Sequence, residues 1–245
     1  MNKHQIIKKA RSDGRFLLTE IESNEILRQG GISVNEIKLA TSRDEASSIS
    51  KQLGFPIVLK IASPDITHKS DAGGVKLGLK TSKQVTKAYD DIMEAIGQKH
   101  PQAMIQGVSV QKMARPGVEV IIGVSKDAQF GPVLMFGLGG IWVEILKDVS
   151  FRIIPLTKRD VKEMIREMKG YPLLAGYRGQ KPVDVSNLEE LLLKVSDFVE
   201  QTPEVKELDL NPIFTYSDGA VAVDARLILE KPIIMGQEQQ DKESG

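Results

Sequence analysis

Two short polar stretches late in this 245-residue chain have the residue types of a magnesium site. Asp209 and Asn211 are one residue apart in an apolar run, so on a strand both side chains point to the same face. Asp224 follows a Tyr-Ser-Asp-Gly turn, and a hairpin at that turn brings its strand beside Asn211. Carboxylate and amide oxygens, completed by water and phosphate oxygens, are the ligands that Mg²⁺ prefers. The alternative is an edge hairpin whose polar side chains face solvent.

An earlier segment carries groups that could handle a phosphate. Lys60 ends an apolar run with the composition of a buried strand, where an unpaired ammonium group is costly. Lys60 therefore either extends its charged end to solvent or reaches a phosphate. The polar loop at 63–74 follows and contains His68 and the pair Gly73-Gly74. A neutral imidazole is a nucleophile toward phosphoryl groups, and glycines let backbone N–H groups approach a phosphate. A solvated histidine beside an ordinary turn fits the same residues.

A third group of residues could contact the rest of a nucleotide. Gln111 and Met113 stand where an apolar strand turns polar, so that edge can offer donors and acceptors to adenine. Glu119, at the start of the next strand, could bind ribose hydroxyls. Arg152 lies on a later strand and could contact a phosphate. An ordinary hairpin is the simpler explanation of the first three, and a structural ion pair explains Arg152 equally well.

The elements that must position these residues alternate between strands and helices, which is typical of an α/β fold. Thr19, Ser42 and Ser82 are the predicted N-caps. Helices are predicted near 3–10, 20–29, 43–53, 83–96, 158–168 and 187–199. Strands are predicted near 36–39, 57–61, 75–79, 108–113, 118–124, 133–136, 142–146, 151–155, 207–214 and 220–224.

Two subdomains follow from this order of elements. We expect an N-terminal extension at 1–18, a first subdomain at 19–107, a second at 108–236 and a disordered tail at 237–245. Ligand pockets favour interfaces between such units, so the cleft between the two subdomains is the expected site.

The composition excludes several classes of function. The formal net charge is zero, which argues against a nucleic-acid partner. No apolar stretch is long enough to span a bilayer, and the N-terminus lacks the apolar core of a signal peptide, so we expect a cytoplasmic protein without a membrane partner. The chain has no cysteine, which removes disulfides, thiolate metal sites and cysteine nucleophiles.

Taken together, these segments resemble an ATP-grasp domain. More narrowly, the chain is similar to the β-subunit of the ADP-forming acetyl-CoA and acyl-CoA synthetases, a group related to the β-subunit of succinyl-CoA synthetase. The resemblance extends from about Thr19 to Pro232. It is carried by the stretches 57–75, 137–144 and 208–212, together with Asp224. It implies two α/β subdomains with the nucleotide in the cleft between them.

The resemblance also implies roles on the nucleotide side. Lys60 would contact the phosphates of ATP or ADP, and Gly73-Gly74 would belong to the loop that covers them. Gln111, Met113 and Glu119 match positions on the adenine and ribose side.

A second set of implied roles concerns the metal and a phosphohistidine relay. Asn211 and Asp224 match the Mg²⁺ ligands. His68 matches the second phosphohistidine of the acyl-CoA members, and Asp209 stands where relatives have a carboxylate that stabilises a phosphorylated imidazole.

The reaction implied by the resemblance is acyl-CoA + ADP + phosphate ⇌ carboxylic acid + ATP + CoA. A partner α-subunit would bind CoA and carry the first phosphohistidine, in an α₂β₂ assembly, so this chain should not make acyl-CoA alone. One alternative is an ATP-grasp carboxylate–amine ligase, which needs an acceptor site in the same chain and no loop histidine. Another is a non-catalytic subunit that binds ADP or ATP for regulation.

Overall fold

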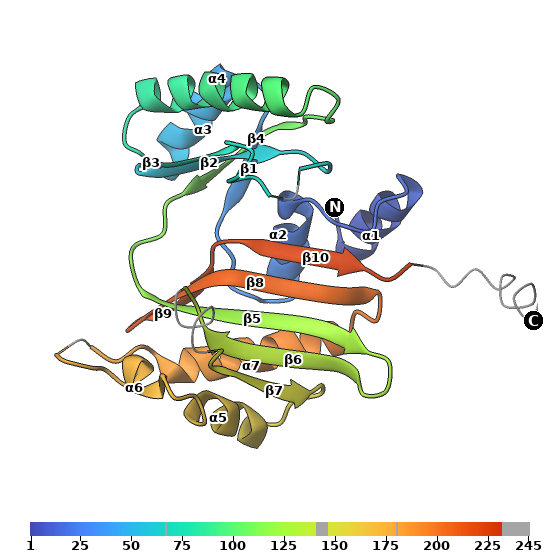
Figure 1. Cartoon of the computed structure of the whole chain (residues 1–245), viewed down its shortest axis with the longest axis vertical. Coiled ribbons are helices and arrows are strands. Elements are labelled where there is room, and N and C mark those ends of the chain that lie inside the picture. Colours follow the sequence, from blue (N-terminus) through green and yellow to red (C-terminus); the bar gives the residue numbers. More distant parts are fainter. Residues whose placement is uncertain (67, 141–146, 180, 232–245) are drawn as a thin grey trace, which may run out of the picture.

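Two antiparallel sheets, stacked one above the other in Figure 1, organise the chain. The computed structural model describes residues 1–66, 68–140, 147–179 and 181–231. No helix in these ranges combines the length and the apolar character needed to cross a membrane. The predicted strand at 142–146 and the predicted disordered tail at 237–245 lie outside the described residues.

The smaller sheet has four strands in the order β1-β4-β2-β3. These are β1 Ile37–Ala40, β2 Ile57–Ala62, β3 Val75–Leu79 and β4 Gly107–Lys112, and the helices beside them are α3 Arg43–Leu53 and α4 Ser82–Lys99. Alternate residues of the strands, such as Leu59 and Val110, pack with α3 and α4 into one apolar core. Because side chains alternate along a strand, Lys60 points to the opposite face of this sheet.

The larger sheet has the order β10-β8-β5-β6-β7, with β9 paired to β8. Its strands are β5 Val118–Asp127, β6 Gly131–Leu138, β7 Val149–Ile153, β8 Val205–Tyr216, β9 Gly219–Ala222 and β10 Ala225–Leu229, and its helices are α1 Lys3–Ser12, α2 Glu20–Gln29, α5 Lys158–Arg166, α6 Tyr171–Leu174 and α7 Val185–Glu200. Leu208 and Leu210 join the core of this sheet. Asp209 and Asn211 alternate with them and are exposed on the other face, as the sequence predicts.

Helix α2 lies between the two sheets and contacts both β1 and β10 (Figure 1). Its apolar residues Ile26 and Leu27 belong to the core of the larger sheet. The predicted division places this helix in the first subdomain at 19–107, and that division stays a prediction. Helix α2 contacts a strand of each sheet and so links the two sheets.

Residue type predicts two helix N-caps correctly and a third incorrectly. Thr19 and Ser42 are N-caps, each accepting a hydrogen bond from a backbone N–H three residues later. The predicted cap at Ser82 is wrong: Thr81 accepts from Gln84 N and Ser82 is the first helical residue. Both residues carry a suitable hydroxyl, so residue type alone does not decide between them.

Two elements, α6 and β10, were not predicted. The expectation that Asp224 lies within a strand is also wrong, because it falls in the break between β9 and β10. The β8–β9 hairpin itself forms at the predicted turn, with Tyr216 opposite Gly219.

Candidate functional site

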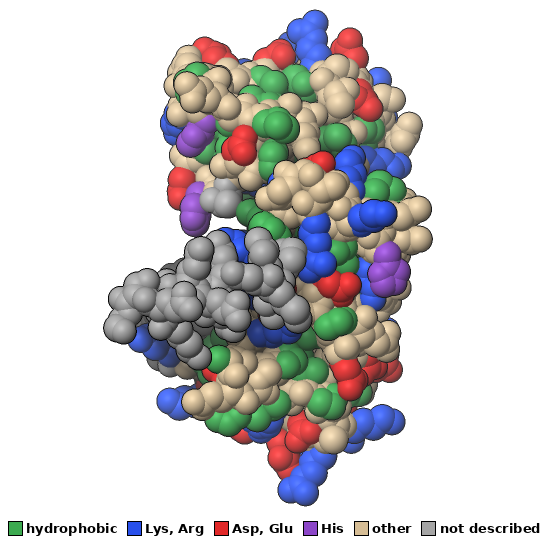
Figure 2. All heavy atoms as spheres, turned by 90° about the vertical axis from the view of Figure 1, so that its right-hand side faces the viewer, with side chains coloured by type: hydrophobic (Ala, Val, Ile, Leu, Met, Phe, Trp, Pro, Cys, Tyr) green, Lys and Arg blue, Asp and Glu red, His purple; other side chains and the backbone are tan. Residues whose placement is uncertain are grey.

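A cavity of about 360 Å³ lies between the β2–β3 side of the smaller sheet and the β8–β10 side of the larger one. The first turn of α2 and the loop at 63–74 complete its wall. In the space-filling view, a histidine side chain (purple) lies at the edge of the upper half of the molecule (Figure 2). The cavity brings together five of the predicted site residues: Lys60, His68, Asp209, Asn211 and Asp224.

The ammonium group of Lys60 stays inside the protein. Its Nζ lies 2.6 Å from Glu20 Oε1 and 3.2 Å from Asp224 Oδ2. The side chain is only 8% exposed, which rules out the interpretation that its charged end extends to solvent. The second oxygen of Glu20, Oε2, lies 2.5 Å from Lys69 Nζ. One buried carboxylate therefore serves two lysines, one on β2 and one on the loop.

The opposite charges of these buried side chains stabilise one another in their ionised forms. Burial alone would raise the pKa of the Glu20 carboxyl, but Lys60 and Lys69 outweigh that effect and lower the pKa below its usual value. Burial would likewise lower the pKa of Lys60, but the carboxylates of Glu20 and Asp224 outweigh it and raise the pKa. The lysine and the glutamate are therefore both ionised at neutral pH.

Asp209, Asn211 and Asp224 gather on the opposite wall. The backbone N–H of Asn211 donates to the carbonyl oxygen of Asp224 at 3.2 Å, which fixes these two residues side by side. Asp209 lies opposite Arg226 in the β8–β10 ladder. Desolvation by the cavity walls raises the pKa of Asp209, the cation of Arg226 opposes this rise, and the charge of Asp224 adds to it.

The loop that carries His68 is folded. Ile66 and Ala72 are buried and belong to the core of the smaller sheet. The N–H of Gly73 donates to Ser70 O at 3.0 Å, and that of Gly74 donates to Lys69 O at 2.8 Å. These N–H groups are therefore used within the loop itself.

Gly74 has a packing role in this loop. A Cβ added there would lie 2.5 Å from Ile61 Cγ2, so the absence of a side chain lets the loop pack against β2. That Gly73 and Gly74 cover nucleotide phosphates stays a prediction.

The residues predicted for the adenine and ribose side are not among those lining the cavity. Gln111 is fully buried, and in the described part of the chain neither atom of its amide has a hydrogen-bond partner. Met113 is 38% exposed. Glu119 is half-buried, and its carbonyl accepts from Gly139 N at 2.8 Å. Nucleotide binding by these three residues stays a prediction.

Arg152 also lies away from the cavity wall. Its Nη1 and Nη2 donate to the two carboxylate oxygens of Glu167, each at 2.9 Å. This is the structural ion pair that the sequence left open as the alternative to a phosphate contact.

Glu20, Lys69 and Arg226 line the cavity but were not singled out from the sequence. A glutamate after an N-cap is explained by the helix dipole alone, so Glu20 gave no separate signal. Lys60, a lysine in an apolar strand, gave the one indication of such a partner. A buried cation requires a carboxylate somewhere in the chain, but the sequence does not show which one.

Comparisons with known proteins identify the family to which this fold belongs. A family model described as an ATP-grasp domain matches residues 9–229, which defines the class of fold. The β-subunit of an ADP-forming acetate–CoA ligase from Pyrococcus furiosus is 51% identical over 225 residues, covering 92% of this chain and 97% of that protein.

Two solved structures are similar over the same length. An acetyl-coenzyme A synthetase from Candidatus Korarchaeum cryptofilum, in complex with coenzyme A and Ca-AMPCP, matches with a TM-score of 0.90 at 46% identity over 93% of this chain and 100% of the matched chain. The same enzyme with coenzyme A and Mg-AMPPCP, its phosphohistidine segment pointing towards the nucleotide binding site, matches with a TM-score of 0.83 at 43% identity over 93% and 100% of the two chains. The chain belongs to the ATP-grasp family, within the group of β-subunits of ADP-forming acetate–CoA ligases.

Proposed function

We propose that this chain is the nucleotide-handling β-subunit of an ADP-forming acyl-CoA synthetase and moves a phosphoryl group between His68 and ADP. The observation that carries this proposal is that His68 shares one cavity with Lys60, Asp209, Asn211 and Asp224. A carboxylate–amine ligase has no use for a histidine at that place, and a regulatory subunit has no use for the whole set.

Asn211 and Asp224 would hold Mg²⁺. They lie side by side on the cavity wall, and together they offer an amide oxygen and a carboxylate. Within the described ranges, no group of three or more His, Cys, Asp or Glu side chains could hold a metal by itself. A site of two protein ligands suits Mg²⁺, which usually takes its remaining ligands from water and substrate phosphates. When bound with the nucleotide, the ion neutralises charge on the transferred phosphoryl group.

The residues of the chain supply positioning and charge for the transfer. In the direction of ATP consumption, a ring nitrogen of neutral His68 forms a bond to the γ-phosphorus while the bond from that phosphorus to the bridging oxygen of ADP breaks. The other ring nitrogen keeps its N–H, and the Asp209 carboxylate can accept a hydrogen bond from it. Lys60 balances the charge of the phosphates. The reverse sequence returns the phosphoryl group to ADP.

A second subunit would complete the reaction. We propose that an α-subunit binds CoA and the acyl group and carries the first phosphohistidine, in an α₂β₂ assembly. The Pyrococcus relative is itself described as a β-subunit, which supports a division of the reaction between two chains.

The test is a phosphorylation assay on the purified chain. It is incubated with γ-labelled ATP and Mg²⁺, with and without an α-subunit of the Pyrococcus type, and the label is mapped by mass spectrometry. Acid-labile, alkali-stable label on His68, absent from His68→Ala, supports the proposal. His100→Ala is the control, because His100 is the C-cap of α4 and does not line the cavity. ATP binding without any labelled histidine, even with the α-subunit present, would contradict the proposal.

A further inference from the structure

The carboxylate of Glu20 pairs with both lysines that line the cavity, Lys60 and Lys69. Oε1 pairs with Lys60 at 2.6 Å and Oε2 pairs with Lys69 at 2.5 Å. Lys69 directly follows His68 in the chain, so this ion pair acts on the backbone next to the histidine. The Glu20 side chain is 5% exposed, so solvent screens these contacts little.

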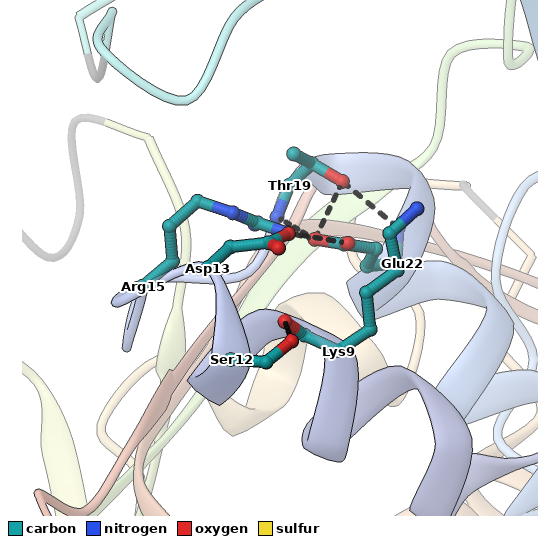
Figure 3. Close-up of polar contacts among 6 residues, drawn as sticks. All are labelled: Lys9, Ser12, Asp13, Arg15, Thr19 and Glu22. Carbon is teal, nitrogen blue, oxygen red and sulfur yellow. Dashed lines mark hydrogen bonds and ion pairs between the residues drawn. The ribbon is translucent and has the colours of Figure 1, made fainter.

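Glu20 is itself held at a rigid place. It is the first residue of α2, and Thr19 and Glu22 form a capping box around it. Arg15 donates to both carboxylate oxygens of Glu22, at 2.9 Å each, and also reaches Asp13 (Figure 3). The first turn of α2 therefore cannot move without breaking this network, and the helix N-terminus favours the negative charge of Glu20.

Two further contacts of the loop come from residues that do not line the cavity, Lys99 and Met104. Lys99 Nζ, from α4, donates to Asp71 O at 3.0 Å. The N–H of Met104 donates to Asp65 Oδ2 at 2.6 Å. Among the ion pairs of the described residues, the pair of Lys69 with Glu20 is the one that ties this loop to the inside of the cavity.

We propose that Glu20 is a positioning residue for the phosphoryl transfer, holding the His68 loop in the cavity through Lys69 and fixing Lys60 with its other oxygen. This inference rests on the proposed function of His68. The Glu20 carboxylate then holds both the His68 loop and Lys60. The distance between the histidine and this lysine therefore does not depend on the loop alone.

Substitutions of Lys69 and of Glu20 should have different effects, because Lys69 makes one of the two ion pairs and Glu20 makes both. Lys69→Gln releases the loop but leaves Lys60 paired with Glu20 and Asp224, so phosphoryl transfer slows while ADP affinity stays. Glu20→Gln releases the loop and also frees Lys60 from one carboxylate, so transfer slows while ADP affinity stays or rises. A loss of folding would instead weaken ADP binding, so the two readouts separate positioning from stability.

The experiment compares single-turnover labelling of His68 and ADP affinity across variants of the full chain, under the conditions that label the wild type. Glu20→Gln and Lys69→Gln should each slow labelling by roughly tenfold to a hundredfold, because a displacement of about 1 Å can cost on the order of a hundredfold. The double variant should be no slower than the slower single variant, because the two side chains act as one unit. Lys69→Arg keeps the cation and should restore much of the rate.

Lys99→Gln is the matched control, because it removes a lysine contact to the same loop from a residue that does not line the cavity. It should label at the wild-type rate. Wild-type rates in Glu20→Gln and Lys69→Gln, additive losses in the double variant, or an equal loss in Lys99→Gln would overturn the inference and leave the proposed function standing. Absence of label on the wild-type chain would overturn both. If Glu20→Gln does not fold, Lys69→Gln and Lys69→Arg carry the test by themselves.

Discussion

The backbone N–H of Asn211 donates to the carbonyl oxygen of Asp224 at 3.2 Å, although Asp224 lies outside both of the strands that flank it. The hairpin of β8 and β9 brings the chain back, and the break before β10 then turns Asp224 into the cavity. There its Oδ2 lies 3.2 Å from Lys60, so the carboxylate borders both the lysine and the proposed metal ligand Asn211.

Asp224→Asn should weaken Mg²⁺-dependent binding of ADP. The substitution keeps the shape of the side chain but removes the charge that would face the ion. We expect a loss of roughly tenfold or more, since changes to residues behind the ligands already cost about 10- to 100-fold in metal affinity. Titration calorimetry with ADP, with and without Mg²⁺, measures it. Asp218→Asn, in the exposed turn of the same hairpin, is the control, and an equal loss there would argue against a ligand role for Asp224.

Lys60→Met should destabilise the fold, because it leaves the buried Glu20 carboxylate with one cation in place of two. Removing one partner of a buried ion pair costs about 3–5 kcal/mol, which is an upper bound here because Lys69 remains. Adding Glu20→Gln should recover part of this loss. Urea unfolding of the two variants gives both values. If the double variant is less stable than Lys60→Met, the pair does not contribute to stability as described.

Asp209→Asn should stabilise the protein and abolish labelling of His68. The pKa of Asp209 is raised above its usual 3.8, so the folded state binds its proton more tightly than the unfolded state does. The charged carboxylate is therefore a cost that appears as the pH rises through this range and remains at neutral pH. Unfolding by urea at several pH values above 3.8 should show a smaller fall in stability with rising pH for the variant. A variant that is less stable than wild type at neutral pH would contradict the direction of this shift.

Gly74→Ala should displace the His68 loop, because the new Cβ would meet Ile61 Cγ2 at 2.5 Å. Overpacking of this kind typically costs about 1–3 kcal/mol. Thermal unfolding measures the loss, and hydrogen exchange of the peptide that spans 63–79 locates it. Gly97→Ala is the matched control, because a Cβ there meets nothing within 4 Å and the residue lies in helix α4. Equal effects of the two substitutions would show that the close contact at Gly74 is not what matters.

The sequence predicted best what depends on neighbours along the chain. The alternation that places Asp209 and Asn211 opposite Leu208 and Leu210 is a local property of a strand. The cap at Thr19 is likewise decided within four residues. Both features could be predicted because a strand and a helix differ in periodicity and in hydrogen bonding within a few residues.

What the sequence did not predict depends on pairing across the chain. Glu20 and Lys60 are forty residues apart, and nothing local shows that the glutamate of a first helical turn enters the site. Arg152 forms a structural ion pair because Glu167, the C-cap of α5, lies within reach of its guanidinium group. Gln111 shares a sheet face with Lys60 by register, yet burial removes it from the cavity wall.

The role of His68 is tested most directly by the return of its phosphoryl group to ADP. The chain is first labelled on His68 with γ-labelled ATP and freed of nucleotide, and then Mg²⁺ and ADP are added. Transfer through His68 predicts rapid loss of label from the histidine and its appearance in ATP, and slow loss in Asp224→Asn. Label that remains on His68, or that leaves only as free phosphate, would contradict a role for this histidine in transfer to ADP.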